Sequence, residues 1–517
     1  MFKGFFRRKL LIGCVVTVLG CQSLPTIAFA EVPASAPSIQ PYLDQVIENI
    51  TEFTLDNGLR FIVLEDNDAP VVSFVTYADV GGVDEPDGKT GVAHFLEHLA
   101  FKGSTTLGTT DYAAEQEVLD RLDVLFDDLQ TAKKVGNERA IAELEAQFTA
   151  VQAEASEYIV QNAFGQVVES AGGVGLNAAT SADYTQYFYS FPSNKLELWM
   201  ALESQRFLDP VFREFYKEKE VILEERRMRT DNSPIGTMVE AFLDTAFTTH
   251  PYRRPVIGYN EDIRNLTRQD VKEFFVEHYA PNNLTIAIVG DVDPEQVQMM
   301  AKAYFGRFPS QAKAPEIELP AEPVQTETRN VTVEFPSQPW YLEGYHAPQL
   351  TDPDYVVYDI ISSILSSGRT SRLYKSLVEE QQVALNAEGF SGFPGEKHPN
   401  LMLFYALTAP GKNVDDVAAS LSTELEKLKT EFVTATELER VKTQARAGLL
   451  RSLDSNMGMA RLLATYEVKT GDWRNLFEQL DQIAAVTVED VQRVAQETFT
   501  AENRTIGKLL PPATTAE

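Results

Sequence analysis

The stretch LTRQDV at 266–271 returns 220 residues later as VTVEDV at 486–491. The similarity continues without gaps as far as NLTI at 283–286 and NRTI at 503–506. In each copy a threonine is placed to cap the start of a helix, and a turn and an apolar strand follow it. The repeat therefore predicts two related halves, each of the α+β class.

The length of 517 residues also favours two domains, because a single hydrophobic core rarely serves so long a chain. A stretch rich in Pro, Ala and Glu at 311–328 is the expected linker. It separates a first domain at 31–310 from a second at 329–517. Apolar runs predict strands at 60–64, 71–75, 285–289 and 401–407.

Two helical runs inside the first domain form an expected insertion at 112–162. Their apolar residues recur three and four positions apart, as in a coiled-coil seam: Val118, Leu122, Leu125 and Leu129, then Ile141, Leu144, Phe148, Val151 and Ala155. Gly136-Asn137 lies between the runs, so we expect a helical hairpin. The spacing indicates a packing or spacer role and assigns no chemistry to it.

The first 30 residues have the pattern of a secretory signal peptide, 1–30. Basic residues at 7–9 precede an apolar run, and Ala28-Phe29-Ala30 fits a cleavage site. Two alternatives stay open, a lipoprotein signal that would leave a lipidated Cys21 and a twin-arginine signal at Arg7-Arg8. We expect a periplasmic protein without a transmembrane span in its mature chain.

Both cysteines, Cys14 and Cys21, lie in this leader, so a metal in the mature protein would be held by histidines and carboxylates. The formal net charge of −31 argues against a nucleic-acid partner, because phosphate binding needs Lys and Arg. It fits either a solvated acidic surface or the steering of basic peptides toward the protein.

Two histidines lie in the stretch HFLEH at 94–98, within good helix-forming sequence. Positions i and i+4 share one face of a helix, so His94 and His98 can bind one ion together. Neutral imidazoles suit Zn²⁺, and Glu97 is placed to take a proton from a zinc-bound water. Taken alone, the pattern also fits a packed or exposed histidine pair.

The longer run GVAHFLEHLAFKG at 91–103 closely resembles the pitrilysin/insulinase family of zinc peptidases, which carry an inverted HxxEH motif. Within the family, the processing-peptidase branch of bacteria and mitochondria is the most similar. The resemblance covers nearly all of the mature chain, including NGL at 57–59, DYT at 183–185 and GDV at 290–292. It implies one Zn²⁺ per chain and two homologous domains, each a mainly antiparallel sheet packed with helices.

The resemblance also implies a third zinc ligand on a later helix, where EKEVILEE at 218–225 matches the family pattern. The match makes Glu225 the ligand. It makes Glu218, about two turns earlier, a carboxylate that contacts a ligand without binding the metal itself. Glu224 is the competing position, about 100° away around the helix. The 127 residues from His98 to Glu225 exceed the usual family interval, and the insertion at 112–162 accounts for the excess.

Substrate binding is implied by GGVGLNAAT at 172–180, which resembles the family's edge strand beside the zinc. There an extended peptide adds as a further strand, and we expect it to contact Asn177, Ala178 and Ala179. Without the family, the stretch is a Gly-rich loop before a strand. In the second half, Val378 and Leu385 stand where the family has an Arg and a Tyr that bind the substrate carbonyl.

The expected function is that of a zinc endopeptidase acting on extended peptides or unfolded protein segments. The missing Arg/Tyr pair predicts a related second subunit that supplies it, with a homodimer as the alternative. The rival functions are a non-catalytic structural or assembly subunit and a peptide-binding subunit without cleavage. The retained His94, Glu97, His98 and Glu225 favour the peptidase.

Overall fold

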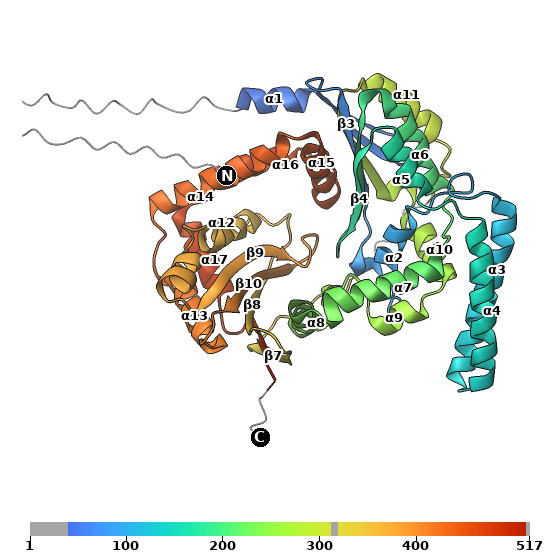
Figure 1. The fold of residues 1–517 in the computed structure, drawn as a ribbon. Helices are drawn as coiled ribbons and strands as arrows, with labels where there is room; N and C mark the ends of the chain where they lie inside the picture. The colour runs from blue at the N-terminus through green and yellow to red at the C-terminus, as the bar shows by residue number, and fades with distance from the viewer. Residues whose placement is uncertain (1–39, 312–318, 513–517) are drawn as a thin grey trace, which may run out of the picture. The chain divides into compact units, whose positions relative to one another are not determined.

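Two mainly antiparallel sheets organise the chain, one in each half (Figure 1). This computed structural model describes residues 40–311 and 319–512. The expected signal peptide, both cysteines and part of the expected linker lie outside the described residues. Helix α1 (Gln40–Glu48) is the first described element.

The first sheet has six strands in the order β1-β2-β6-β3-β5-β4. They are β1 (Ile50–Thr54), β2 (Arg60–Glu65), β3 (Val71–Ala78), β4 (Val174–Thr180), β5 (Thr185–Pro192) and β6 (Leu284–Gly290). Strand β6 pairs in parallel with β2 and antiparallel with β3. Strand β4 lies at the edge and pairs with β5 alone among the described strands.

The second sheet repeats this arrangement with five strands in the order β7-β11-β8-β10-β9. They are β7 (Arg329–Glu334), β8 (Trp340–Ala347), β9 (Ala384–Phe393), β10 (Asn400–Thr408) and β11 (Arg504–Leu510). Strand β11 is parallel to β7 and antiparallel to β8, as β6 is to β2 and β3. The predicted fold class, two related α+β halves with mainly antiparallel sheets, is confirmed.

The sequence repeat appears as one helix and one strand in each half. Helices α10 (Arg268–His278) and α17 (Val488–Thr498) both begin with a capping box. Thr267 and Asp270 form the first, and Thr487 and Asp490 form the second. In a capping box each side chain accepts a hydrogen bond from the other residue's backbone N–H, which satisfies donors that a helix start leaves free. The next strand, β6 or β11, lies between two other strands of its sheet.

Each sheet buries one face against helices of its own half. In the first half, Phe74 of β3 stacks on Trp199 of α6, with ring centroids 4.4 Å apart. In the second half, α12 packs against β9 and buries Ile360, Ile361 and Ile364 completely. The helices not described elsewhere are α5 (Ala163–Ser170), α6 (Leu196–Leu208), α8 (Pro234–Ala246), α9 (Asn260–Asn265), α11 (Pro294–Tyr304), α12 (Tyr355–Ser366), α13 (Val414–Thr430), α14 (Ala435–Leu453), α15 (Asn456–Thr470) and α16 (Asn475–Ala485).

The fully buried carboxylate of Asp183, in the turn after β4, joins the two halves. It accepts hydrogen bonds from the backbone N–H groups of Glu396 (2.7 Å) and Lys397 (3.0 Å), and from the hydroxyl of Tyr252. Lys469 of α15 lies 3.9 Å from the same carboxylate. Helix α15 itself packs on β3 and β6, so the second half covers part of the first sheet (Figure 1).

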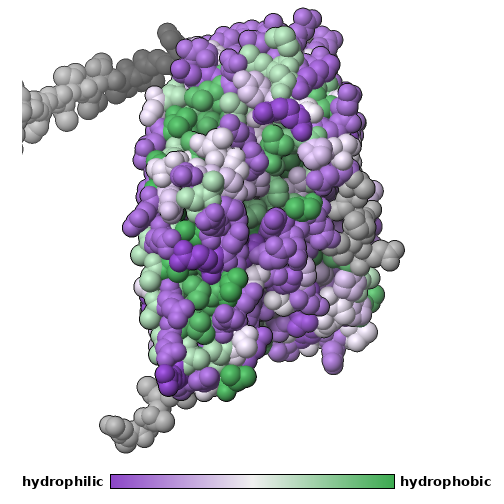
Figure 2. Space-filling model, turned by 90° about the vertical axis from the view of Figure 1, so that its right-hand side faces the viewer, coloured by the Kyte–Doolittle hydropathy of each residue, from purple (hydrophilic) through white to green (hydrophobic). Residues whose placement is uncertain are grey.

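The expected hairpin consists of α3 (Tyr112–Lys134) and α4 (Glu138–Glu157). Asp111 and Asn137 cap the two helices, and Phe126 and Phe148 both pack on Tyr216, each with ring centroids 5.0 Å away. Hydrophilic residues cover most of the face on which the hairpin lies, with apolar patches between them (Figure 2). Within the described part of the chain, none of the helices is long and apolar enough to cross a membrane.

Candidate metal centre

Helix α2 (Val92–Leu99) carries both histidines, and its first turn is fixed from outside the helix. It begins at Gly91, whose φ is +87° and whose missing Cβ would lie 2.6 Å from the carbonyl oxygen of Ile257. Only glycine adopts this conformation at so close an approach. The buried carboxylate of Glu85 then accepts hydrogen bonds from the backbone N–H groups of Gly91 and Ala93, both at 2.9 Å. Glu85 thereby caps a helix whose own N-cap residue has no side chain.

Helix α7 (Phe215–Arg226) brings the second set of charged groups to α2. Phe95 of α2 stacks on Phe215 of α7, with ring centroids 4.6 Å apart. Lys102, just after α2, contacts Glu218 at 2.5 Å and Glu214 at 3.2 Å. The stack and the ion pairs fix the position of α2 relative to α7. The geometry of the candidate ligands depends on this position.

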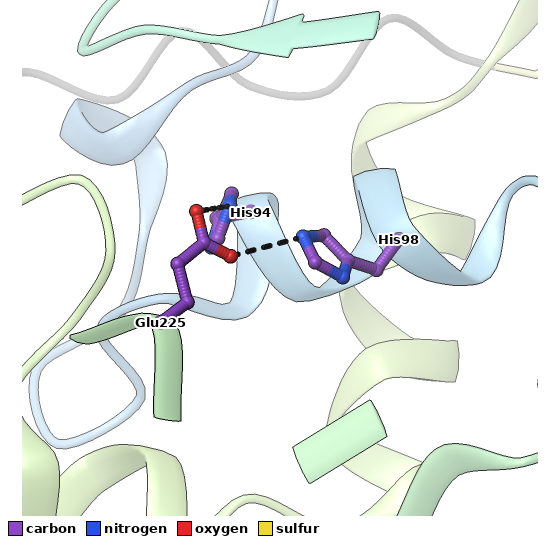
Figure 3. Close-up of side chains that lie close together, drawn as sticks. All are labelled: His94, His98 and Glu225. Carbon is purple, nitrogen blue, oxygen red and sulfur yellow. Dashed lines mark ion pairs between the residues drawn. The ribbon is translucent and has the colours of Figure 1, made fainter. Parts of the chain in front are cut away.

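Three side chains from these helices converge: His94, His98 and Glu225 (Figure 3). Glu225 Oε1 lies 3.8 Å from His94 Nε2, and Glu225 Oε2 lies 3.5 Å from His98 Nε2. Tetrahedral Zn²⁺ with ligands at roughly 2.1 Å holds those ligands about 3.4 Å apart. Two imidazoles and one carboxylate with this spacing therefore fit a catalytic type of zinc site, in which a fourth position stays open.

The two imidazoles have opposite pKa shifts, and the charged form is favoured only at His98. Burial lowers the pKa of His98, but hydrogen bonds to Glu218 and Glu225 outweigh burial and raise it to about 9. Burial and the neighbouring His98 hold the pKa of His94 well below its usual range. A divalent cation would take the place of the proton between these carboxylates, as metal binding generally displaces protons from its ligands.

Two of the other acidic residues in the matched pattern, Glu218 and Glu224, lie in different places. Glu218 Oε2 is 3.3 Å from His98 Nδ1, the ring nitrogen that faces away from Glu225, which is the contact expected of a supporting carboxylate. Glu224 also borders the cleft, but it is exposed and pairs with Arg227 instead of the histidines. Arg229, one turn after Glu225, reaches its Oε1 at 2.6 Å.

Glu97 lies on the same helix, half-buried beside the histidines, and accepts a hydrogen bond from the hydroxyl of Thr180 in β4. Burial raises the pKa of Glu97, although the Thr180 hydrogen bond opposes this. A carboxyl group with a raised pKa can both accept and return a proton near neutral pH.

A cleft of roughly 920 Å³ opens beside this group and runs along the edge strand β4. Its walls include His94, Glu97, His98 and Glu225, and Asn177, Ala178 and Ala179 lie on the strand side. Ala178 is buried, whereas Asn177 and Ala179 are exposed, as strand alternation requires. Between Val174 and Asn177 the register with β5 shifts in a bulge, so regular pairing covers only residues 177–180.

Neither Val378 nor Leu385 is among the residues that line this cleft. Val378 packs against the core of the second half, and Leu385 is 53% exposed on β9. The nearby Arg372 forms a two-bond ion pair with Glu437 and is thus committed within its own half. Neither of the two positions offers a side-chain hydrogen-bond donor.

Three supporting residues were not predicted from the sequence: Glu85, Lys102 and Thr180. Thr180 could have been found, because it is two residues from Ala178 and strand alternation turns both toward α2. Lys102 lies four residues after His98, a spacing that indicates a shared helix face, although α2 ends at Leu99. Glu85 precedes its helix by too many residues for any local capping pattern to identify it.

Comparison with protein families gives two matches, which cover successive segments of the chain. A model described as insulinase (peptidase family M16) matches residues 60–120 and 150–259. A model described as peptidase M16 inactive domain matches residues 265–445. The unmatched segment 121–149 falls within the α3–α4 hairpin.

Individual proteins show the same likeness. Zinc protease PqqE of Helicobacter pylori is 30% identical over 452 residues, which cover 86% of this chain and 89% of the relative. The crystal structure of a protease from Helicobacter pylori matches with a TM-score of 0.76 and 28% identity, over 89% of this chain and 99% of that one. The periplasmic protease PqqL from Escherichia coli shares the fold, with a TM-score of 0.65 and 19% identity, over 90% of this chain and 48% of its own.

Proposed function

The chain belongs to the insulinase family of peptidases (M16), and from this premise we propose that it is a zinc-dependent endopeptidase acting on extended peptides or unfolded protein segments. The observation that carries the proposal is the convergence of His94, His98 and Glu225, with Glu97 beside them, in a cleft along the free edge of β4. A non-catalytic subunit of the same fold would not need this complete set of groups.

The residues of the cleft have different roles in the proposed hydrolysis. Zn²⁺ held by His94, His98 and Glu225 would supply Lewis-acid chemistry, polarising a carbonyl and lowering the pKa of water to about 7. Glu97 accepts the proton at its carboxylate and passes it to the leaving amine, while Thr180 keeps that carboxylate oriented. The backbone of residues 177–180 binds the peptide as an added strand, which demands an extended and therefore unfolded substrate.

Metal removal tests this function directly. The purified protein is expected to contain about one zinc per chain and to cleave a quenched fluorescent peptide. Dialysis against a chelator should abolish both, and one equivalent of Zn²⁺ should restore them, because the ligands remain folded in place. Elemental analysis and a fluorescence assay measure the two quantities. Absence of zinc together with absence of cleavage would favour the non-catalytic subunit.

A second subunit is the partner that we propose. Val378 and Leu385 leave the second half without donors for the substrate carbonyl, and this chain spans only 48% of PqqL, whose longer chain has room for two more halves. A related chain would supply the Arg and Tyr. We also propose a periplasmic location, which the leader-like residues 1–30 support.

Co-expression tests the partner. The chain alone should show weak activity, and a co-purified related subunit should raise the turnover at least about tenfold, as expected when donors that stabilise an oxyanion are restored. Gel filtration of the pair and the peptide assay give the result. Full activity from a homodimer of this chain would contradict the proposal.

A further inference from the structure

Helix α15 carries three polar side chains, spaced four residues apart, that contact β5 or the turn before it. Lys469 lies near Asp183, Thr465 accepts a hydrogen bond from the side chain of Gln186, and Arg461 stacks on Phe188. In β5, Tyr187 and Tyr189 belong to the core that also contains α2, so Gln186 and Phe188 face the opposite side of the sheet. The α15 side chains therefore lie on the face of the first sheet that is turned away from α2.

Arg461 differs from the neighbouring cation in its partners. The ammonium group of Lys469 lies 2.9 Å from Glu396 and 3.9 Å from Asp183. The guanidinium carbon of Arg461 lies 3.6 Å from the centre of the Phe188 ring, and its buried Nε has no hydrogen-bond partner in the described structure. Among the described residues no carboxylate forms an ion pair with Arg461, although the chain has 76 acidic residues against 45 basic ones.

The buried Nε of Arg461 costs free energy, because it has no acceptor in the described structure. The cation–π contact with Phe188 replaces its lost hydration only in part. An apolar side chain would pack on Phe188 without this cost. The Nη groups of Arg461 form no hydrogen bond among the described residues, and a planar guanidinium can make a two-bond contact with a carboxylate.

The position of Arg461 relates it to the substrate edge. Phe188 pairs with Asn177 of β4, and Asn177 is one end of the regular segment 177–180. A peptide added to β4 lies about 10 Å from β5, two strand spacings away, and turns every second side chain toward the α15 face. A long arginine and a carboxylate-bearing chain together reach across that distance. Asn177, the partner of Phe188, is three residues along β4 from Thr180, and Thr180 donates a hydrogen bond to Glu97.

We propose that Arg461 binds a carboxylate of the peptide that lies along β4, on the face opposite the metal, and so selects substrates with an acidic group about three residues from the scissile bond. The proposal rests on the peptide-binding function proposed above. The carboxylate belongs either to an Asp or Glu side chain or to the C-terminus of a short peptide. Arg461 is thus a specificity-determining residue contributed by the second half of the chain.

Peptide scanning tests the proposal on the full chain, with its partner subunit where one co-purifies. Glu is compared with Gln at each position within four residues of the cleaved bond, and the free C-terminal acid is compared with the amide. At one position, or at the C-terminus, the acidic peptide should show kcat/KM about tenfold higher, the size expected of one charge-assisted contact. The Arg461→Gln variant should cleave the acidic and neutral peptides equally.

Two further variants separate recognition from folding. Arg461→Met keeps the packing on Phe188 and should also lose the preference, because a neutral residue makes no ion pair. Arg139→Gln removes the same charge from a side chain that is 89% exposed on the hairpin and should keep the preference. A preference that persists in Arg461→Gln, or equal rates for every Glu/Gln pair in wild type, would overturn the proposal.

Binding to a Glu97→Gln background distinguishes this inference from the proposed function. Fluorescence anisotropy with the same labelled peptides needs no hydrolysis, so it reports on Arg461 even if the chain proves inactive. Tighter binding of the acidic peptide that disappears on Arg461→Gln supports the carboxylate site alone. Equal binding of acidic and neutral peptides by an active enzyme would reject the site and leave the peptidase intact.

Discussion

Replacement of Glu97 by Gln is expected to lower the rate of peptide hydrolysis about 10³-fold, while the protein keeps its metal and its fold. An amide has almost the same shape as the carboxylate and can still contact Thr180, but it cannot accept and return a proton. His94, His98 and Glu225 are untouched by the change, so the affinity for zinc should stay the same. Single-turnover kinetics and elemental analysis measure the two effects.

The matched control for this variant is Glu220→Gln. Glu220 lines the same cleft on an exposed part of α7, and within the described structure it forms neither a hydrogen bond nor an ion pair with the histidines. Its replacement removes the same charge and should leave hydrolysis within about twofold, since exposed single charges have small effects. If Glu97→Gln retained more than about a tenth of the wild-type rate, Glu97 would not be the proton acceptor.

Replacement of Glu225 by Ala should weaken zinc binding by more than about 100-fold and abolish hydrolysis. Loss of an outer contact to a metal ligand already costs about 10–100-fold in affinity, and a direct ligand contributes more. Without Glu225, only two imidazoles remain to hold the ion, and Arg229 loses the carboxylate with which it pairs. Competition with a zinc-binding dye measures the affinity.

The neighbouring Glu224 provides the control for Glu225. It is exposed, pairs with Arg227 and lies on the same helix, so Glu224→Ala tests the loss of one charge and one helical glutamate. Zinc affinity should then stay within about threefold, because a surface ion pair contributes little. The opposite pattern, with zinc lost in Glu224→Ala and kept in Glu225→Ala, would show that the ligand assignment is wrong.

Features that depend on nearby residues were predicted well. Thr267 was predicted to cap its helix, and it does so. His94 and His98 are four residues apart, so helical geometry alone brings the two imidazoles together. The strand order also repeats, because the same helix and strand stand at 266–286 and 486–506 in the two halves. Such patterns are readable because the interacting groups are neighbours in the chain.

Features that join distant segments were not predicted from residue patterns. Glu225 is 127 residues from His98, and only the family resemblance pointed to it. The packing of α15 on β3 and β6 was unforeseen, because an amphipathic helix shows which face is buried without showing which sheet buries it. For the same reason the contacts of Asp183 and Arg461 could not be predicted before the fold was known. The Asp183 side chain is fully buried, and Arg461 is partly buried.

The bulge in β4 limits edge-to-edge aggregation between copies of the protein. A free sheet edge is a template on which copies of a protein aggregate, because its unpaired N–H and C=O groups accept any extended strand. Here the bulge between Val174 and Asn177 limits the regular edge to four residues. The net charge of −31 adds repulsion between copies. The edge proposed to bind peptides is thus short, and charge repulsion opposes its pairing with the same edge of a second copy.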